Sequence, residues 1–224
     1  MARPQALRGC AGLKSMCNLY RMTKGTQEVA RLFAVEGDLA ANYGAEVYPG
    51  YPGLVVAEGR ARAMTWGFPL VLKGRQGQPL KPKPVTNARA DKLDTAFWRD
   101  SFARRRCLIP VSQWAEPCGS AGRMTRSWYG LPGEDLFAVA GLWRGTAEWG
   151  HCYTMVMTES SAAMADVHDR MPVILRRDDW PRWTEGGFED ALSLCQTWPG
   201  NLTADHTQGR WVDDAPLPQQ PGLL

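Results

Sequence analysis

The sequence predicts a single α+β domain built around a curved, mostly antiparallel, barrel-like β-sheet with short peripheral helices. Three observations indicate this class. The 224-residue chain is long enough for one domain with a substantial core. Its hydrophobic content of 44% and charged content of 22% are typical of a globular protein. Short strand patterns alternate irregularly with short helical patterns, without an internal repeat or a composition break that would separate two domains.

The first half of the chain contains one helix and one hairpin, whose ends are marked by capping and turn residues. Thr26 is the expected N-cap of a helix whose apolar face continues until Gly37 stops it. Strands at residues 54–57 and 61–66 are joined by a turn of three residues, as in a hairpin. Glycine, proline and lysine dominate residues 73–84, which predicts an exposed loop.

The second half alternates apolar strand patterns with short helical patterns. The domain boundaries follow from composition: an N-terminal extension at 1–15, the domain at 16–212, and a disordered tail rich in proline and glutamine at 213–224. Strands are expected at residues 107–111, 136–143, 152–158 and 171–175, and helices at residues 97–106, 161–167, 178–183 and 188–196.

Charge and cysteine usage narrow the functional class. The formal net charge of +3 permits a nucleic-acid partner without demonstrating one. The six cysteines form no C-x-x-C pair, and three histidines do not complete a zinc pattern. No secretion signal and no apolar run of roughly 20 residues is present. We therefore expect a monomer in the reducing cytoplasm, with no membrane association, no metal and no organic cofactor.

The most informative stretch is Met16-Cys17. If the chain began at Met16 and lost its initiator methionine, Cys17 would be the N-terminal residue. A terminal cysteine carries both a thiol and an α-amine, whose unperturbed pKa is about 7.7–8.0. Such an aminothiol can form an imine with an aldehyde and then close a five-membered ring through sulfur. The alternative for any single cysteine is a buried small hydrophobe.

Three further polar residues follow apolar or turn-forming stretches. Asn87 can donate and accept hydrogen bonds, although an Asx turn or helix cap is the alternative. Glu116 follows the expected strand 107–111, where partial desolvation would raise its pKa toward acid–base use; the alternative is a solvated turn glutamate. His168 lies beside an acid and an arginine and suits proton transfer, with a structural, backbone-bonded histidine as the alternative.

These residues belong to an ordered set of short motifs that spans about residues 16 to 185. The motifs are Met16-Cys17-Asn18-Leu19-Tyr20-Arg21-Met22, Met64-Thr65-Trp66-Gly67-Phe68-Pro69, Asn87-Ala88-Arg89-Ala90, Arg106-Cys107-Leu108-Ile109-Pro110, Trp114-Ala115-Glu116 and His168-Asp169-Arg170-Met171-Pro172. The set resembles the SOS response-associated peptidase (SRAP) family, whose members crosslink covalently to abasic sites in single-stranded DNA.

The resemblance implies a site and a mechanism. Cys17, once N-terminal, would be the nucleophile, with Asn87, Glu116 and His168 completing the catalytic site. Glu116 would take the proton of the α-amine and help to expel water as the imine forms. Sulfur addition would then give a thiazolidine, while His168 moves protons at the sugar hydroxyl and Asn87 holds the opened sugar or the terminal residue.

The resemblance also implies that Trp66, Arg89 and Arg170 bind DNA, the tryptophan by stacking on a base and the arginines by contacting phosphates. Core packing at the end of a strand is the alternative for Trp66. Arg104-Arg105-Arg106 would add positive potential or form a solvated helix face.

The chain departs from the family pattern in three places. The common start Cys-Gly-Arg is Cys17-Asn18-Leu19 here, so an arginine is missing and Arg21 is the candidate replacement. The common Tyr-Glu-Trp is Ala115-Glu116-Pro117. Residues 1–16 precede the cysteine, and an amine in a peptide bond cannot form an imine. We expect Met16 to be the true start; removal by self-cleavage and an inactive chain are the alternatives.

Three functional hypotheses follow from these features. The first is a DNA-damage protein of the SOS response that crosslinks to and shields abasic sites, with lyase-type chemistry. The second is a cysteine-type peptidase acting on itself or on other proteins, with Cys17, His168 and Glu116 as nucleophile, base and electrostatic partner. The third is a non-covalent single-stranded DNA binding module in which Cys17 is incidental.

Overall fold

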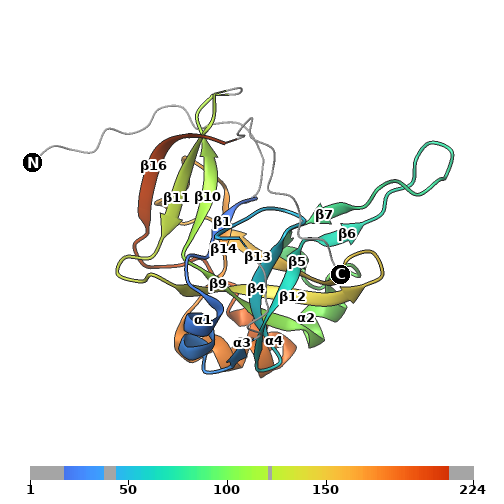
Figure 1. The fold of residues 1–224 in the computed structure, drawn as a ribbon, viewed down its shortest axis with the longest axis horizontal. Helices are drawn as coiled ribbons and strands as arrows, with labels where there is room; N and C mark the ends of the chain where they lie inside the picture. Colours follow the sequence, from blue (N-terminus) through green and yellow to red (C-terminus); the bar gives the residue numbers. More distant parts are fainter. Residues whose placement is uncertain (1–17, 38–43, 121–122, 212–224) are drawn as a thin grey trace, which may run out of the picture.

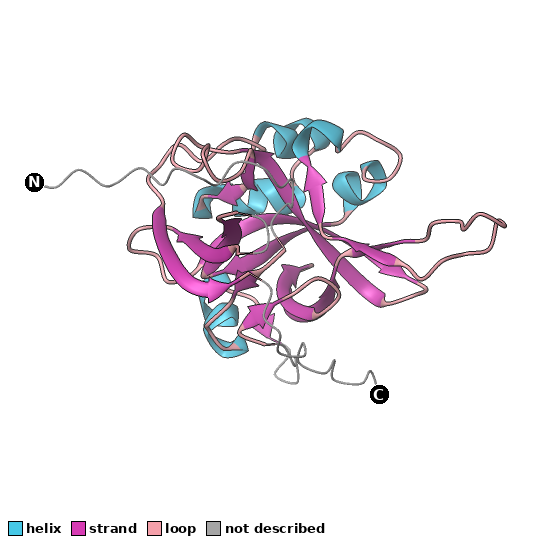
Figure 2. Cartoon of the chain, turned by 90° about the horizontal axis from the view of Figure 1, so that it is seen from above, coloured by secondary structure: helices cyan, strands magenta, loops and turns pink. Residues whose placement is uncertain are grey.

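Strands dominate the computed structural model, which describes residues 18–37, 44–120 and 123–211. In this part of the chain the strands form two large sheets and a two-stranded arm that projects from the body (Figure 1). Short helices lie around the outside of the strands (Figure 2). Within the described residues, no helix is both long and apolar enough to cross a membrane.

The larger sheet contains a closed ring of five strands: β4 (Pro52–Ala57), β5 (Arg60–Trp66), β9 (Arg106–Val111), β12 (Phe137–Thr146) and β13 (Gly150–Glu159). The strands pair in the order β13–β12–β9–β4–β5, and β5 returns to β13. This closing pair is parallel, whereas the other four pairs are antiparallel. Closure leaves no exposed sheet edge in the ring. The ring confirms the predicted curved, mostly antiparallel, barrel-like sheet.

Shorter strands extend the ring, and two of them pair with the end of β13. These strands are β2 (Glu36–Gly37), β8 (Asn87–Arg89), β14 (Arg170–Pro172) and β15 (Ile174–Leu175). Met157 of β13 pairs with Arg89 of β8 and with Pro172 of β14. The strand that carries Asn87 and the strand that follows His168 therefore meet the same stretch of β13.

The second sheet has the order β16 (Thr203–Arg210), β11 (Thr125–Gly130), β10 (Gln113–Cys118), β1 (Tyr20–Arg21) and β3 (Glu46–Val47). Strand β10 continues from β9 of the ring after a bend at Ser112, whose amide donates to the carbonyl of Arg21. The chain therefore passes almost directly from one sheet to the other. Strands β10, β11 and β16 were not expected from the sequence.

The helices are short and partly differ from expectation. The expected helix at 161–167 is a series of turns. The first helix begins after Gly25, whose amide donates to the Glu28 carboxylate at 3.2 Å, so Thr26 is not its cap. The described helices are α1 (Thr26–Phe33), α2 (Arg99–Arg104), α3 (Trp180–Glu185) and α4 (Phe188–Ser193), with 3₁₀ turns η1 (Ala90–Lys92) and η2 (Arg177–Asp179).

An aromatic cluster joins the two sheets. Tyr20 of β1 meets Trp66 of β5 edge-on at 5.0 Å, and Trp66 stacks on Tyr153 of β13 at 6.5 Å between ring centroids. The two tyrosine hydroxyls share a hydrogen bond over Gly53, where a Cβ atom would collide with both. All three aromatic side chains are buried. Glycine at position 53 is therefore required for the two sheets to meet here.

Candidate active site

Glu116 is a fully buried carboxyl group in the middle of β10. It lies opposite Ser127 of β11, not at the end of a strand as the sequence suggested. Neither carboxylate oxygen has a hydrogen-bond partner among the described residues. Burial raises its pKa well above the ordinary value, and the nearby charge of Asp169 raises it further. A carboxyl group in this environment is suited to accept and return a proton.

His168 lies in the turn before β14, and its Nδ1 contacts the backbone of Arg170. The amide nitrogen of Arg170 is 2.9 Å away and its carbonyl oxygen 3.1 Å away. An amide N–H can only donate, so the shorter contact makes Nδ1 an acceptor and leaves the proton of a neutral imidazole on Nε2. Nε2 is buried, with no hydrogen-bond partner in the described part of the chain. Its proton is therefore available to a bound group.

Asn87 belongs to a short chain of polar side chains that reaches the start of the described structure. Its Nδ2 donates to Thr86 Oγ1 at 3.0 Å, and that hydroxyl donates to Asn18 Oδ1 at 3.2 Å. Asn87 and Thr86 are both buried. Asn18 is bonded covalently to Cys17, which lies outside the described residues. This series of hydrogen bonds therefore connects Asn87 with the residue that follows the predicted nucleophile.

The segment after Cys17 also runs beside the strand of Glu116. The amide of Ala115 donates to the carbonyl of Leu19 at 3.0 Å, and Tyr20 pairs with Trp114. In this antiparallel register Leu19 lies opposite Ala115, and one residue further along Asn18 comes opposite Glu116. Asn18 is thus held between Thr86 on one side and the strand of the buried carboxyl on the other.

Arg89 and Arg170 flank the end of β13 on different strands. Arg89 is opposite Met157, and Arg170 is opposite Glu159. Arg89 is exposed and makes two hydrogen bonds to Asp91, at 2.9 and 2.7 Å, which raise the pKa of Arg89 and lower that of the Asp91 carboxyl. The positive charge of Arg170 also lowers the pKa of Asp91. The two arginines therefore share one neighbouring carboxylate.

Trp66 is a core residue, which corrects the expected stacking role. Its side chain is fully buried between Tyr20 and Tyr153, and Nε1 donates to the carbonyl of Thr86 at 3.1 Å. An indole enclosed in this way has no free face for a base. Core packing, the alternative left open by the sequence, is what the structure contains.

Trp66→Phe tests this correction. The substitution removes one buried hydrogen bond and some packing volume, so we expect it to lower the free energy of unfolding by about 1–2 kcal/mol. Affinity for single-stranded DNA should stay within twofold of wild type. Urea denaturation and fluorescence anisotropy would measure the two quantities. A tenfold loss of DNA affinity with unchanged stability would restore the stacking role.

The other candidate cations do not gather at this site. Arg21 lies on the opposite face of the second sheet from Glu116, because it alternates with Tyr20, which pairs with Trp114 on the Glu116 side. Its guanidinium is 3.6 Å above the Trp128 ring and 3.0 Å from Glu46. It is therefore not positioned to replace the arginine missing after Cys17.

The side chains of the run Arg104-Arg105-Arg106 also interact with groups outside the candidate site. Arg104 and Arg105 both pair with Asp100. Arg106 is buried and donates to backbone carbonyls, including that of Trp183. The three side chains are thus engaged with one carboxylate and with backbone carbonyls and do not form a run of unpaired positive charges.

A serine–histidine pair beside Glu116 was missed by the sequence reasoning. Ser127 lies directly opposite both Glu116 and His206, so the three residues form one row across β10, β11 and β16. The Ser127 hydroxyl is 2.9 Å from Nδ1 of His206. Serine is buried and histidine is exposed. No local signal identified this pair because its strands were not predicted.

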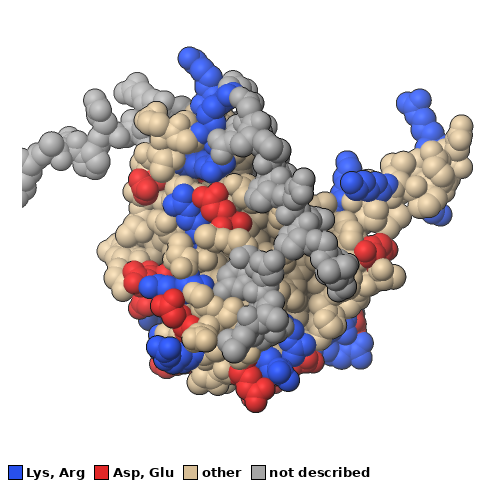
Figure 3. All heavy atoms as spheres, in the orientation of Figure 1, with Lys and Arg blue, Asp and Glu red and all other residues tan. Residues whose placement is uncertain are grey.

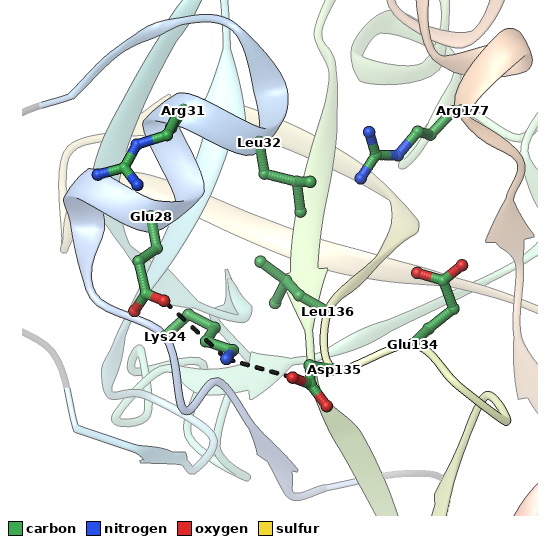
Figure 4. Close-up of a pocket in the computed structure, with 8 residues that line it drawn as sticks. All are labelled: Lys24, Glu28, Arg31, Leu32, Glu134, Asp135, Leu136 and Arg177. Atoms are coloured by element: carbon green, nitrogen blue, oxygen red, sulfur yellow. Dashed lines mark hydrogen bonds and ion pairs between the residues drawn. The ribbon is translucent and has the colours of Figure 1, made fainter.

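A separate pocket of about 450 Å³ lies between α1 and the segment before β12 (Figure 4). Lys24 stands between Glu28 and Asp135, at 3.9 and 3.4 Å. The pocket shares no residue with the predicted site, and its charges are mixed. Neither here nor anywhere else in the described ranges do three His, Cys, Asp or Glu side chains form a group that could hold a metal.

Solved structures with the same fold share only low sequence identity with this chain. A protein from Bordetella bronchiseptica has a TM-score of 0.72 and 22% identity, and the match covers 85% of this chain and 99% of that one. A protein from Bacteroides thetaiotaomicron has a TM-score of 0.70 and 17% identity, covering 85% and 91% of the two chains. At these identities the likeness establishes the fold: a single α+β domain around a closed, mostly antiparallel sheet.

Sequence comparison is more specific. The abasic site processing proteins YoqW and YobE of Bacillus subtilis are each 33% identical to this chain in an alignment of 109 residues that covers 44% of the chain. The match spans about half the length of these relatives, 47% and 48% respectively. The model of the SOS response associated peptidase (SRAP) family matches residues 16–210. The chain belongs to the SRAP family.

Proposed function

We propose that this protein processes abasic sites in single-stranded DNA by bonding covalently to the opened sugar through Cys17. The observation that carries the proposal is the buried carboxyl of Glu116, which has no hydrogen-bond partner among the described residues and lies on the strand that pairs with the segment after Cys17. The names of the Bacillus subtilis relatives support abasic DNA as the substrate. Family membership supports the role in DNA damage.

The reaction requires a free α-amine on Cys17, so residues 1–16 are absent from the active form. The amine attacks the C1′ aldehyde of the ring-opened sugar and gives a carbinolamine. Loss of water then gives an imine, and addition of the thiol to the imine carbon closes a thiazolidine. One water leaves in total, and no oxidant or reductant is consumed. The product is a five-membered ring that joins protein and DNA.

Glu116 supplies the proton transfers of the first stage. In its carboxylate form it accepts a proton from the attacking amine, and in its acid form it donates to the departing hydroxyl. Both forms must be accessible at working pH, and the raised pKa of the buried carboxyl supports this requirement. Burial without a competing hydrogen-bond partner leaves both oxygens available to the substrate.

His168, Asn87 and the two arginines complete the proposed site. The Nε2–H of His168 donates to a sugar hydroxyl, in keeping with the Nδ1 contact that fixes its tautomer. Asn87, held by Thr86, orients the sugar or the terminal residue. Arg89 and Arg170 contact phosphates on either side of the lesion. We further propose that the protein works as a cytoplasmic monomer.

The family description also supports a second candidate, cysteine-type peptidase activity directed at the bond before Cys17. Such an activity would remove residues 1–16 once and expose the amine needed for the DNA reaction. It would act on peptide without DNA, which separates it from the main proposal.

A labelled single-stranded oligonucleotide with one abasic site tests the proposed function. After incubation with protein that starts at Cys17, denaturing electrophoresis should show a slow band that survives detergent and heat. An oligonucleotide with a tetrahydrofuran in place of the abasic sugar is the matched control, because it lacks the aldehyde. Absence of the band, or an equal band with the tetrahydrofuran strand, would contradict the proposal.

A further inference from the structure

The two-stranded arm that projects from the body is an ordered hairpin. It consists of β6 (Phe68–Leu70), β7 (Lys83–Val85) and the residues between them, and we call residues 68–85 the β6–β7 arm. Beyond the strands, the amide of Leu80 donates to the carbonyl of Leu72, and Gly74 and Gln78 close the tip. The predicted exposed loop at 73–84 is therefore the outer part of a defined arm (Figure 1).

The arm carries one sign of charge. Its four ionisable residues are all basic and exposed, and no aspartate or glutamate occurs from Gly67 to Arg89. None of the four forms an ion pair with a described residue, in contrast with Arg89, Arg104 and Arg105. Blue side chains accordingly stand out along the arm in Figure 3. The four residues are Lys73, Arg75, Lys81 and Lys83.

The arm also carries exposed apolar side chains. Val71, Leu72 and Leu80 are 42%, 43% and 43% exposed, and they are the large hydrophobic residues left exposed in the described part of the chain. Cations together with apolar groups match a single nucleic-acid strand, which offers phosphates and the faces of unpaired bases. An acidic protein surface is the competing partner, and the experiment below distinguishes it.

One limb of the arm starts beside the candidate active site, and the other is held by β13. Phe68 pairs with Val85, and the chain continues from Val85 directly to the buried Thr86 and Asn87. On the other limb, the amide of Gly67 donates to the carbonyl of Tyr153 at 2.7 Å. The arm therefore ends two residues before Asn87, next to the place where the lesion would bind.

Close packing at Gly67 fixes the direction of the arm. Gly67 has a φ of +117°, and a Cβ atom there would lie 2.5 Å from Cβ of Pro84. Prolines at 69, 79, 82 and 84 further restrict the two limbs. Little conformational entropy is lost when a ligand binds to a surface already ordered in this way.

We propose that the β6–β7 arm binds the phosphate backbone of the DNA strand that flanks the abasic site. The inference rests on the proposed function and extends it, because it assigns a binding surface outside the catalytic residues. The arm lengthens the contact with DNA and holds the strand during the covalent steps at Cys17.

The test measures the salt dependence of binding to an intact single-stranded oligonucleotide, which has no aldehyde and forms no crosslink. Each lost phosphate contact lowers the slope of log K against log salt by about 0.7 for a single strand. The variant K73Q/R75Q/K81Q/K83Q should therefore reduce the slope by about 3, and R75Q/K81Q by about 1.4. The matched control, R31Q/R177Q, removes two exposed cations from the separate pocket and should leave the slope unchanged.

The outcomes separate the arm from the proposed function. Thermal melting checks that all variants are folded, as expected for exposed side chains without ion pairs. An unchanged slope in the fourfold variant, with the crosslink to abasic DNA still formed, would overturn the arm inference alone and favour an acidic protein partner. Failure of wild-type protein to bind or crosslink any DNA would overturn both proposals.

Discussion

Protein that starts at Cys17 and carries Cys17→Ala is expected to form no adduct with abasic DNA that survives denaturation. The variant keeps the terminal amine but loses the thiol that closes the thiazolidine. An imine is the last species it can form, and imines hydrolyse when the protein unfolds. Denaturing electrophoresis should show the adduct lowered at least a hundredfold, while borohydride added before denaturation should trap the remaining imine.

Cys195→Ala is the matched control for the cysteine substitution. Cys195 is a free, buried cysteine in the segment after α4, and it has no place in the proposed site. Burial raises the pKa of its thiol to about 12, so it is a poor nucleophile. The control should form the adduct at the wild-type rate. A stable adduct from Cys17→Ala would show that another nucleophile reacts with the sugar.

Glu116→Gln is expected to slow adduct formation by about 10²–10⁴-fold, the usual contribution of a general acid–base. The amide keeps the shape of the side chain but cannot exchange the proton of the amine. Single-turnover rates with excess protein, measured by quenching into denaturant, would give the ratio. Glu134→Gln, at an exposed position in the separate pocket, is the control and should react normally.

The same substitution should stabilise the protein. The glutamine amide would lack a hydrogen-bond partner as the protonated carboxyl does, but it cannot ionise. Above its unfolded-state pKa, Glu116 must take up a proton on folding or be buried as a charge, and the substitution removes this cost. Replacing the ionisable group should raise the melting temperature by about 2–4 °C for each kcal/mol gained in the free energy of unfolding. Activity and stability therefore change in opposite directions at this residue.

The stability difference should depend on pH with a defined sign. The folded-state pKa of Glu116 is raised above its unfolded value, so the folded protein binds the proton more tightly. The stabilisation from that proton is complete below the unfolded-state pKa and is lost as pH rises through the folded-state pKa. As the pH rises from the unfolded-state pKa to the folded-state pKa, wild type should thus lose stability relative to Glu116→Gln. A difference that stays constant from acid to neutral pH would contradict the assignment.

The parts of the fold that the sequence predicted are those with compact apolar runs and clear turns. The hairpin of β4 and β5 follows this rule, because Glu58 and Gly59 take positive φ angles in its turn. Strand β16 could not be found in this way, since its residues are almost all exposed and polar and it forms by pairing with β11. Its existence depends on a partner distant in the sequence.

The candidate site was predictable in its residue types but not in its surroundings. Glu116 was expected just after the end of the strand at 107–111, and β10 was not predicted, because both of its faces are buried and the usual alternation of polar and apolar residues is lost. The surroundings of Trp66 were equally hard to predict. A lone aromatic residue at the end of a strand gives no indication whether it faces a ligand or, as here, two tyrosines.

Hydrogen-bond partners were beyond the reach of sequence reasoning. Thr86 links Asn87 to Asn18 across a separation of 68 residues, and Ser127 reaches His206 across 79. Such contacts are set by how the two sheets meet and have no local pattern. The resemblance to the family indicated the candidate residues, and the structure adds the burial that raises the pKa of Glu116.

The central claim is tested most directly by the intact mass of the protein expressed from its native gene, before and after incubation with single-stranded DNA that carries one abasic site. The account predicts a polypeptide that begins at Cys17 and an adduct equal to protein plus DNA less one water. A polypeptide that retains residues 1–16 and yet forms the adduct, or one that begins at Cys17 and forms none, would contradict it.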